Sequence, residues 1–119
     1  MNKAIFSIVS SLFLLTSCLP FKSLNSTTYI KANDAFILGN NEHGKFYANI
    51  TNTSNKDITI WQYPISGGKH SPFVLKGLSN TKLAVDKNTS LRFENMNTEE
   101  VAIKLKVTGD VGLSMGYKN

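Results

Sequence analysis

Few side chains in this sequence can carry out covalent or metal chemistry. Cys18 is the only cysteine among 119 residues, and His43 and His70 are the only histidines. A zinc or copper site needs several thiolate or imidazole ligands from one folded unit. The sequence therefore predicts no metal centre and no cofactor, and a lone cysteine permits no disulfide within the chain.

Catalytic groups are equally sparse. Ser66 and Ser71 do not lie in the G-x-S-x-G pattern that presents a hydrolase nucleophile. Glycosidases use two facing carboxylates, whereas the adjacent pair Glu99 and Glu100 is expected at a solvated hairpin tip. We expect no catalytic residues and a non-enzymatic protein. A small hydrolase that uses His70 or the scattered acids is a remaining alternative.

The setting of Cys18 indicates a different use for its sulfur. A short charged leader, residues 1–3, precedes an apolar stretch at residues 4–15. That stretch matches the core of a secretory signal peptide and is too short to span a bilayer of about 30 Å. The motif LTSC then occupies residues 15–18. One branched apolar residue, two small residues and a cysteine resemble the lipobox of bacterial lipoproteins.

The lipoprotein resemblance implies a cleaved signal peptide, residues 1–17, and a diacylglyceryl group on Cys18, often with a further acyl chain on its amine. Two or three acyl chains anchor a protein stably, at about 0.8 kcal/mol per buried methylene. Residues 18–28 are then the lipidated cysteine and a tether. Because Leu19 is not an aspartate, the resemblance favours the outer membrane, facing the periplasm. An ordinary secretory signal with a free thiol, or an uncleaved anchor, is the alternative.

The distribution of charge excludes one class of partner. The chain carries 13 basic and 8 acidic residues, and its lysines are dispersed. A nucleic-acid-binding protein normally shows a dense basic stripe with interleaved aromatics, so no nucleic-acid partner is expected. We interpret the lysines mainly as a solvated surface. A mild attraction to anionic envelope polymers or lipid head groups is the functional alternative.

The folded body is expected at residues 29–119, where the pattern is that of β-strands. Short runs of β-branched and aromatic residues are separated by clusters of Gly, Asn, Asp, Ser and Pro. The clearest strand is VAIKLKV, residues 101–107, and residues 111–117 are expected to form a C-terminal hairpin with it. Roughly eight strands with short connections predict an antiparallel β-sandwich or a small barrel.

Two stretches resemble the strand–turn–strand units of immunoglobulin-like domains. They are FYANITNTSNKDITIW, residues 46–61, and SLRFENMNTEEVAIKLKV, residues 90–107. The resemblance implies an immunoglobulin-like sandwich. It carries no functional residues with it, because this architecture hosts many activities.

The connection with the most unusual chemistry is WQYPISGGKHSPF, residues 61–73. Aromatic rings near a polar Gly-Gly loop are typical of surfaces that bind sugars or peptides, since rings stack on apolar faces. The alternative is that the rings simply cover one face of a sheet. The predicted contact residues are Trp61, Tyr63, Lys69, His70 and Phe73.

Together these features predict a lipid-anchored, non-enzymatic envelope module that presents sandwich loops to a partner. The partner is expected to be an envelope protein or a glycan such as peptidoglycan. An alternative is a lipoprotein that inhibits lysozyme, because ISGGKH resembles the Ser-Gly stretch of one such family. Lys69 and His70 stand where that family would place an aromatic residue, and its stabilising disulfide cannot form here.

Overall fold

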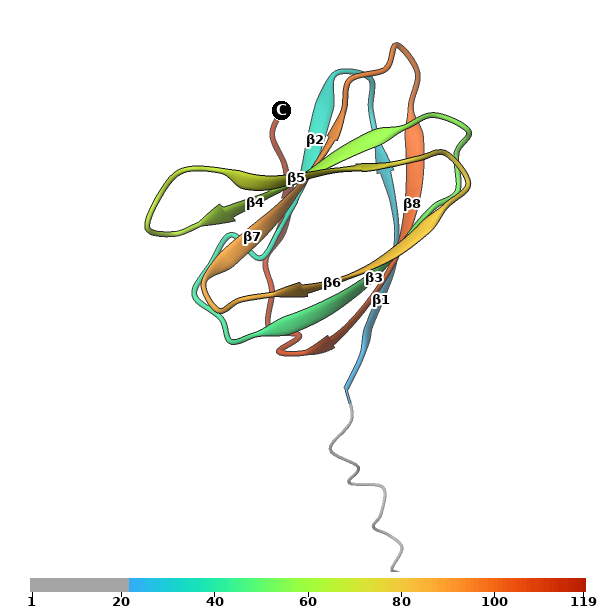
Figure 1. Cartoon of the computed structure of the whole chain (residues 1–119). Helices are drawn as coiled ribbons and strands as arrows, with labels where there is room; N and C mark the ends of the chain where they lie inside the picture. The colour runs from blue at the N-terminus through green and yellow to red at the C-terminus, as the bar shows by residue number, and fades with distance from the viewer. Residues whose placement is uncertain (1–21) are drawn as a thin grey trace, which may run out of the picture.

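The computed structural model describes residues 22–119, which form nine β-strands in two antiparallel sheets (Figure 1). The strands are β1 (Leu24–Ile30), β2 (Asp34–Leu38), β3 (Phe46–Asn52), β4 (Ile58–Pro64), β5 (His70–Leu75), β6 (Asn80–Val85), β7 (Thr89–Asn95), β8 (Val101–Gly109) and β9 (Met115–Tyr117). The described part of the chain contains no helix long and apolar enough to cross a membrane.

The two sheets pack face to face as a sandwich. The strand order is β1-β8-β3-β6 in the four-stranded sheet and β5-β4-β7-β2-β9 in the five-stranded sheet. The predicted antiparallel sandwich is confirmed, and the sheets are not closed into a barrel. The first eight strands follow the order of a jelly roll, in which β1 and β2 lie in opposite sheets. Immunoglobulin domains instead place their first two strands in one sheet.

The connectivity follows from loops that cross between the sheets. A strand–turn–strand pattern in a sequence is compatible either with a hairpin or with such a crossing. Residues 46–61, for example, form β3 and β4, which lie in different sheets. The connection between β4 and β5 is different, because it joins two strands that pair within the same sheet.

The predicted C-terminal hairpin is wrong. β8 pairs with β1 and β3, whereas β9 pairs with β2, with Met115 opposite Leu38. The intervening residues are diverted at Asp110, whose carboxylate accepts hydrogen bonds from the backbone N–H of Gly44 at 2.6 Å and of Gly112 at 2.8 Å. These bonds fix the chain so that it crosses to the other sheet.

The folded body also begins earlier than predicted. β1 starts at Leu24, which pairs with Val107, so residues 24–28 belong to the sheet and not to the tether. Their sequence, LNSTT, contains one apolar residue and therefore gives no alternation of polar and apolar side chains, although burial alternates along the strand. Cys18 and the predicted signal peptide, residues 1–17, lie outside the described residues.

The core is built by alternation along each strand. In β8 Val101, Ile103, Leu105 and Val107 are buried, while Lys104 and Lys106 face solvent, as the sequence predicts. Phe46 and Phe93 are the largest fully buried side chains. Burying a side chain of this size contributes about 1.5–3 kcal/mol, so the inward residues hold the sheets together and leave the outward residues available for function.

Candidate functional site

Three of the sequence-predicted site residues come together on the outer face of the five-stranded sheet. Trp61 and Tyr63 both project outward from β4, and Lys69 lies in the β4–β5 hairpin. The Lys69 Nζ is 4.2 Å from the centroid of the Trp61 ring. The Trp61 Nε1 donates a hydrogen bond to the Glu94 Oε1 at 3.0 Å. The Arg92 guanidinium lies 4.2 Å over the ring of Tyr63.

In this aromatic cluster (Trp61, Tyr63, Lys69, Arg92 and Glu94), the rings and charged groups contact one another. Each ring is covered by a cation, and both rings are half-buried. The Arg92 Nε is buried without a hydrogen-bond partner within residues 22–119, so stacking on Tyr63 holds the guanidinium. These contacts favour the packing alternative, because a sugar would first have to displace the cations from the rings.

The structure places the other two predicted residues elsewhere. His70 is exposed, pairs with Gln62, and has its Nδ1 2.8 Å from the Ser71 Oγ. Phe73 lies opposite Ile60 and so faces the core side at the edge of the sheet, with 40% of its surface exposed. In the part of the chain that the structure describes, neither side chain has a hydrogen bond or a ring contact with the aromatic cluster.

A different surface, the outer face of the four-stranded sheet, gathers the polar and basic residues that sequence reasoning left dispersed. We call it the polar sheet face. Two in-register rows cross all four strands. Their members, from β6 to β1, are Lys82, Asn49, Lys106 and Asn25 in one row and Asn80, Thr51, Lys104 and Thr27 in the other.

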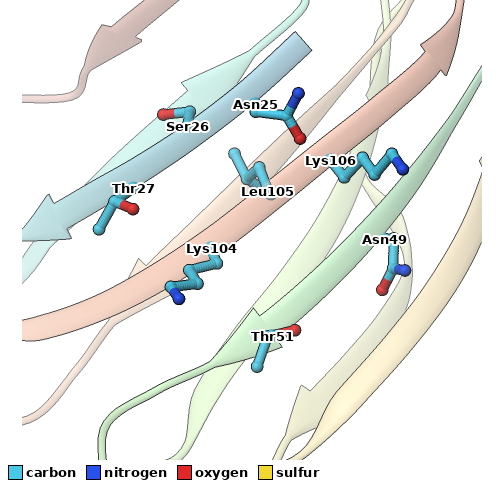
Figure 2. A pocket seen from close by; sticks show the side chains of 8 residues that line it. All are labelled: Asn25, Ser26, Thr27, Asn49, Thr51, Lys104, Leu105 and Lys106. Atoms are coloured by element: carbon cyan, nitrogen blue, oxygen red, sulfur yellow. The ribbon is translucent and has the colours of Figure 1, made fainter. Parts of the chain in front are cut away.

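The first of two hollows on this face lies around Lys104 and Lys106 (Figure 2). Its volume is about 340 Å³, and both lysines project from β8 between two strands that carry amides and hydroxyls. Figure 2 shows Asn25 and Thr27 on the β1 side, and Asn49 and Thr51 on the β3 side.

The second hollow adjoins the first. It has a volume of about 460 Å³ and extends over β3 to the edge strand β6, where Lys82 lines it. Asn49 and Lys106 line both hollows, so the two together form one shallow depression that runs across the four strands. Tyr47 lies at its end.

Hydrogen bonds fix the orientation of the side chains between the lysines. The Asn80 Nδ2 donates to the Asn49 Oδ1 and to the Thr51 Oγ1, both at 2.7 Å. With its oxygen engaged in this way, Asn49 keeps its Nδ2 for an outside acceptor, and the Thr51 hydroxyl keeps its proton. The face therefore presents fixed hydrogen-bond donors between positive charges.

The electrostatics of the polar sheet face are one-sided. Its three lysines, Lys82, Lys104 and Lys106, have no carboxylate among the outward residues of the same four strands. Within residues 22–119 the one ion pair found is Lys76–Asp57, at 3.9 Å, on exposed loops elsewhere. An unbalanced group of cations creates a positive potential that attracts anionic ligands.

Two further titratable residues, His43 and Asp110, make hydrogen bonds that hold loops in place. His43 is buried, with its Nε2 2.9 Å from the Thr89 carbonyl oxygen and its Nδ1 2.6 Å from that of Gly44. The backbone N–H groups of Gly44 and Gly112 hold the pKa of the Asp110 carboxyl below its ordinary value. No group of three or more potential metal ligands occurs in the described residues.

Comparisons with known proteins inform the fold alone. No family model matches this sequence, and no curated protein matches it. Among solved structures, the capsular polysaccharide assembling protein CapF from Staphylococcus aureus is similar, with a TM-score of 0.54 and 12% identity. The similarity covers 76% of this chain and 24% of CapF, so the chain spans about a quarter of its length. The Yersinia pseudotuberculosis-derived mitogen is similar with a TM-score of 0.48 and 19% identity, and the similarity covers 74% of this chain and 86% of the mitogen.

Proposed function

We propose that this protein is a non-enzymatic, lipid-anchored binding module of a bacterial envelope, and that the polar sheet face is its binding surface. The observation that carries the proposal is the pair of adjoining hollows across the four strands. Their polar side chains are amides, hydroxyls and ammonium groups, which hold a ligand by hydrogen bonds and charge. Acid–base catalysis would instead require a positioned acid and base.

The anchoring part of the proposal rests on the lipobox at Cys18. β1 starts at Leu24, six residues after that cysteine. An extended chain of six residues spans about 20 Å, so a lipidated Cys18 holds the first strand close to the membrane. The outer membrane, on its periplasmic side, is the location that this motif favours.

The mass of the mature N-terminus tests the anchor. We expect cleavage before Cys18 and acyl chains on that residue, and we expect both to be lost in Cys18→Ala. Detergent partitioning of the same two proteins gives an independent measurement, since only the acylated form should enter the detergent phase. A wild-type protein with an unmodified thiol would refute lipid anchoring.

Filling the hollows tests the binding surface. Thr27→Tyr with Ala84→Tyr adds a ring over each hollow, and both positions are exposed on strands. The matched control places the same two rings away from the four-stranded sheet, at Val74 on β5 and at Lys118, the residue after β9. We expect solubilised envelope polymers to be retained by wild type and control, and to be lost by the filled variant. Equal retention by all three proteins would place binding elsewhere.

A second candidate function is lysozyme inhibition through the β4–β5 hairpin. Figure 1 shows this hairpin projecting beyond the sandwich, and at Gly67 and Gly68 an added Cβ would meet nothing within 4 Å. A projecting loop of this kind is what insertion into an enzyme cleft requires. A cell-wall clearing assay with excess protein decides the matter, because unslowed lysozyme removes this candidate.

A further inference from the structure

In one row of the polar sheet face lysines alternate with asparagines, and in the other row a single lysine, Lys104, lies between two threonines. In the row that contains two lysines, Lys82 is opposite Asn49, Asn49 is opposite Lys106, and Lys106 is opposite Asn25. Neighbouring strands lie about 4.8 Å apart, so the Cα atoms of Lys82 and Lys106 are about 10 Å apart. Lys104 lies two residues before Lys106 on β8, at a distance of about 7 Å along the strand. A ligand with repeated negative charges at such spacings matches this pattern.

The groups between the lysines match sugar hydroxyls. Asn25, Thr27, Asn49 and Thr51 line the first hollow beside Lys104 and Lys106. Amides and hydroxyls donate and accept hydrogen bonds in the same way that sugar hydroxyls do. A chain that carries charge alone, such as polyphosphate, would leave these groups without partners.

Two exposed tyrosines lie at opposite ends of the face, one on the edge strand β1 and one on the inner strand β3. Tyr29 on β1 is 57% exposed and pairs with Ala102, while Tyr47 on β3 is 50% exposed and pairs with Ala84 and Thr108. The alanines leave space beside each ring, on which the apolar face of a sugar can stack. Ala102 and Thr108 lie six residues apart on β8, or about 20 Å. The Lys45 Nζ, 5.6 Å from the centroid of the Tyr47 ring, adds a cation at that end.

We infer that the ligand of the polar sheet face is an acidic polysaccharide, which lies diagonally across three strands, from Tyr29 on β1 over β8 to Tyr47 on β3, with Lys82 on β6 at its side. The inference rests on the proposed function and adds the chemical class of the ligand. Lys104, Lys106 and Lys82 neutralise the charges of the chain, and Asn49 and Thr51 bind its hydroxyls. Single-stranded nucleic acid fits less well, because its bases need aromatic rings between the cations, and here the rings lie at the ends.

The test uses the full-length protein in detergent and four probes of similar chain length. Oligogalacturonate carries both charge and hydroxyls, dextran carries hydroxyls without charge, polyphosphate carries charge without sugar, and single-stranded DNA represents nucleic acid. We expect oligogalacturonate to bind most tightly and to weaken as salt rises, because exposed charges are screened. Isothermal titration calorimetry measures all four affinities under one set of conditions.

A charge-matched pair of variants locates the site. We expect Lys104→Gln with Lys106→Gln to weaken oligogalacturonate binding about tenfold, since two exposed ion pairs with the ligand are lost. Lys87→Gln with Lys118→Gln removes the same charge away from the face and should leave the affinity unchanged. Tyr29→Ala and Tyr47→Ala should weaken oligogalacturonate without changing the weak binding of polyphosphate. Thermal unfolding of each variant confirms that it is folded.

The outcomes separate this inference from the proposed function. Dextran bound as tightly as oligogalacturonate, with no effect of the lysine pair, would overturn the acidic ligand while the face remained a binding surface. Polyphosphate or DNA bound more tightly than the sugar chain would overturn it in favour of a general polyanion or a nucleic acid. Unchanged retention of envelope polymers by the hollow-filling variant would remove the surface itself, and the inference with it.

Discussion

At the scale of single residues, two buried asparagines fix the loops at one end of the sandwich. Asn52 closes β3, where its Nδ2 donates to the Lys56 carbonyl oxygen at 2.6 Å and its Oδ1 accepts from the Ser54 N–H at 3.0 Å. Asn95 occupies the equivalent place at the end of β7. Both side chains are almost fully buried, so their polar atoms depend on these partners.

Replacing Asn95 tests this role. Its Nδ2 lies 2.8–3.1 Å from the carbonyl oxygens of Ile30, Lys31 and Glu99, and its Oδ1 accepts from the Asn97 N–H. Asn95→Ala leaves buried carbonyls without donors, so we expect a loss of about 2–3 kcal/mol in the free energy of unfolding. Denaturant titration measures the loss. The exposed replacement Asn25→Ala is the control, and equal midpoints for the two variants would contradict the prediction.

The pH dependence of stability should report on Asp110. Its pKa is lowered in the folded protein by hydrogen bonds from Gly44 and Gly112. The stabilisation is therefore complete above the unfolded pKa, about 3.9, and is lost as the pH falls through the lower folded value. We expect Asp110→Asn to be less stable than wild type at pH 7, and the gap to narrow below about pH 4. Parallel stability curves down to acid pH would rule this out.

At the scale of elements, the packing of loops against each other sets the geometry of the strand ends. The β5–β6 loop rests on the β3–β4 loop through the Leu78 N–H, which donates to the Ser54 carbonyl oxygen at 2.8 Å. Leu78 is held at a φ of 61° and is 74% exposed. This conformation is unfavourable for a branched side chain, so the neighbouring contacts must maintain it.

Gly77 shows how close the two loops are. A Cβ at this position would stand 2.5 Å from the backbone carbon of Asn55, and backbone cannot rotate away as a side chain can. We expect Gly77→Ala to cost about 1–3 kcal/mol, a typical penalty for overpacking, measured by thermal unfolding. Gly116→Ala is the matched control, because nothing lies within 4 Å of its added Cβ. An unchanged Tm for Gly77→Ala would mean that the loops separate freely.

Element by element, the sequence predicts the strands better than their partners. The alternation of apolar and basic residues around Lys104 and Lys106 is enough to predict which side chains of this strand face solvent. Their neighbours on β1 and β3 could not be predicted, because register depends on pairings between segments more than 50 residues apart, such as Asn49 with Lys106. The C-terminal hairpin failed for a similar reason. The hydrogen bond from the Gly44 N–H to Asp110 joins residues 66 positions apart, so the sequence around Asp110 does not indicate it.

At the scale of the whole molecule, the candidate sites divide between the two sheets. The sequence singled out Trp61 and Lys69, which are close together in the chain and do meet. It missed Arg92 and Glu94, which join them from β7, and it missed the polar sheet face. Lysines dispersed along the sequence look like an ordinary solvated surface. Only the strand order β1-β8-β3-β6 brings Lys82, Lys104 and Lys106 onto one face without a carboxylate.

The position of β1 has a mechanical consequence. This strand is the one nearest to Cys18 in the chain, it is an edge strand, and seven residue pairs join it to β8. Under the proposed anchoring, a force between the membrane and a polymer held on the polar sheet face travels along β1 and directly into β8. A pull along the axis of β1 loads those paired residues together in shear. The five-stranded sheet does not carry this force, because the strand that follows the tether and the residue pairs that resist the pull all belong to the four-stranded sheet.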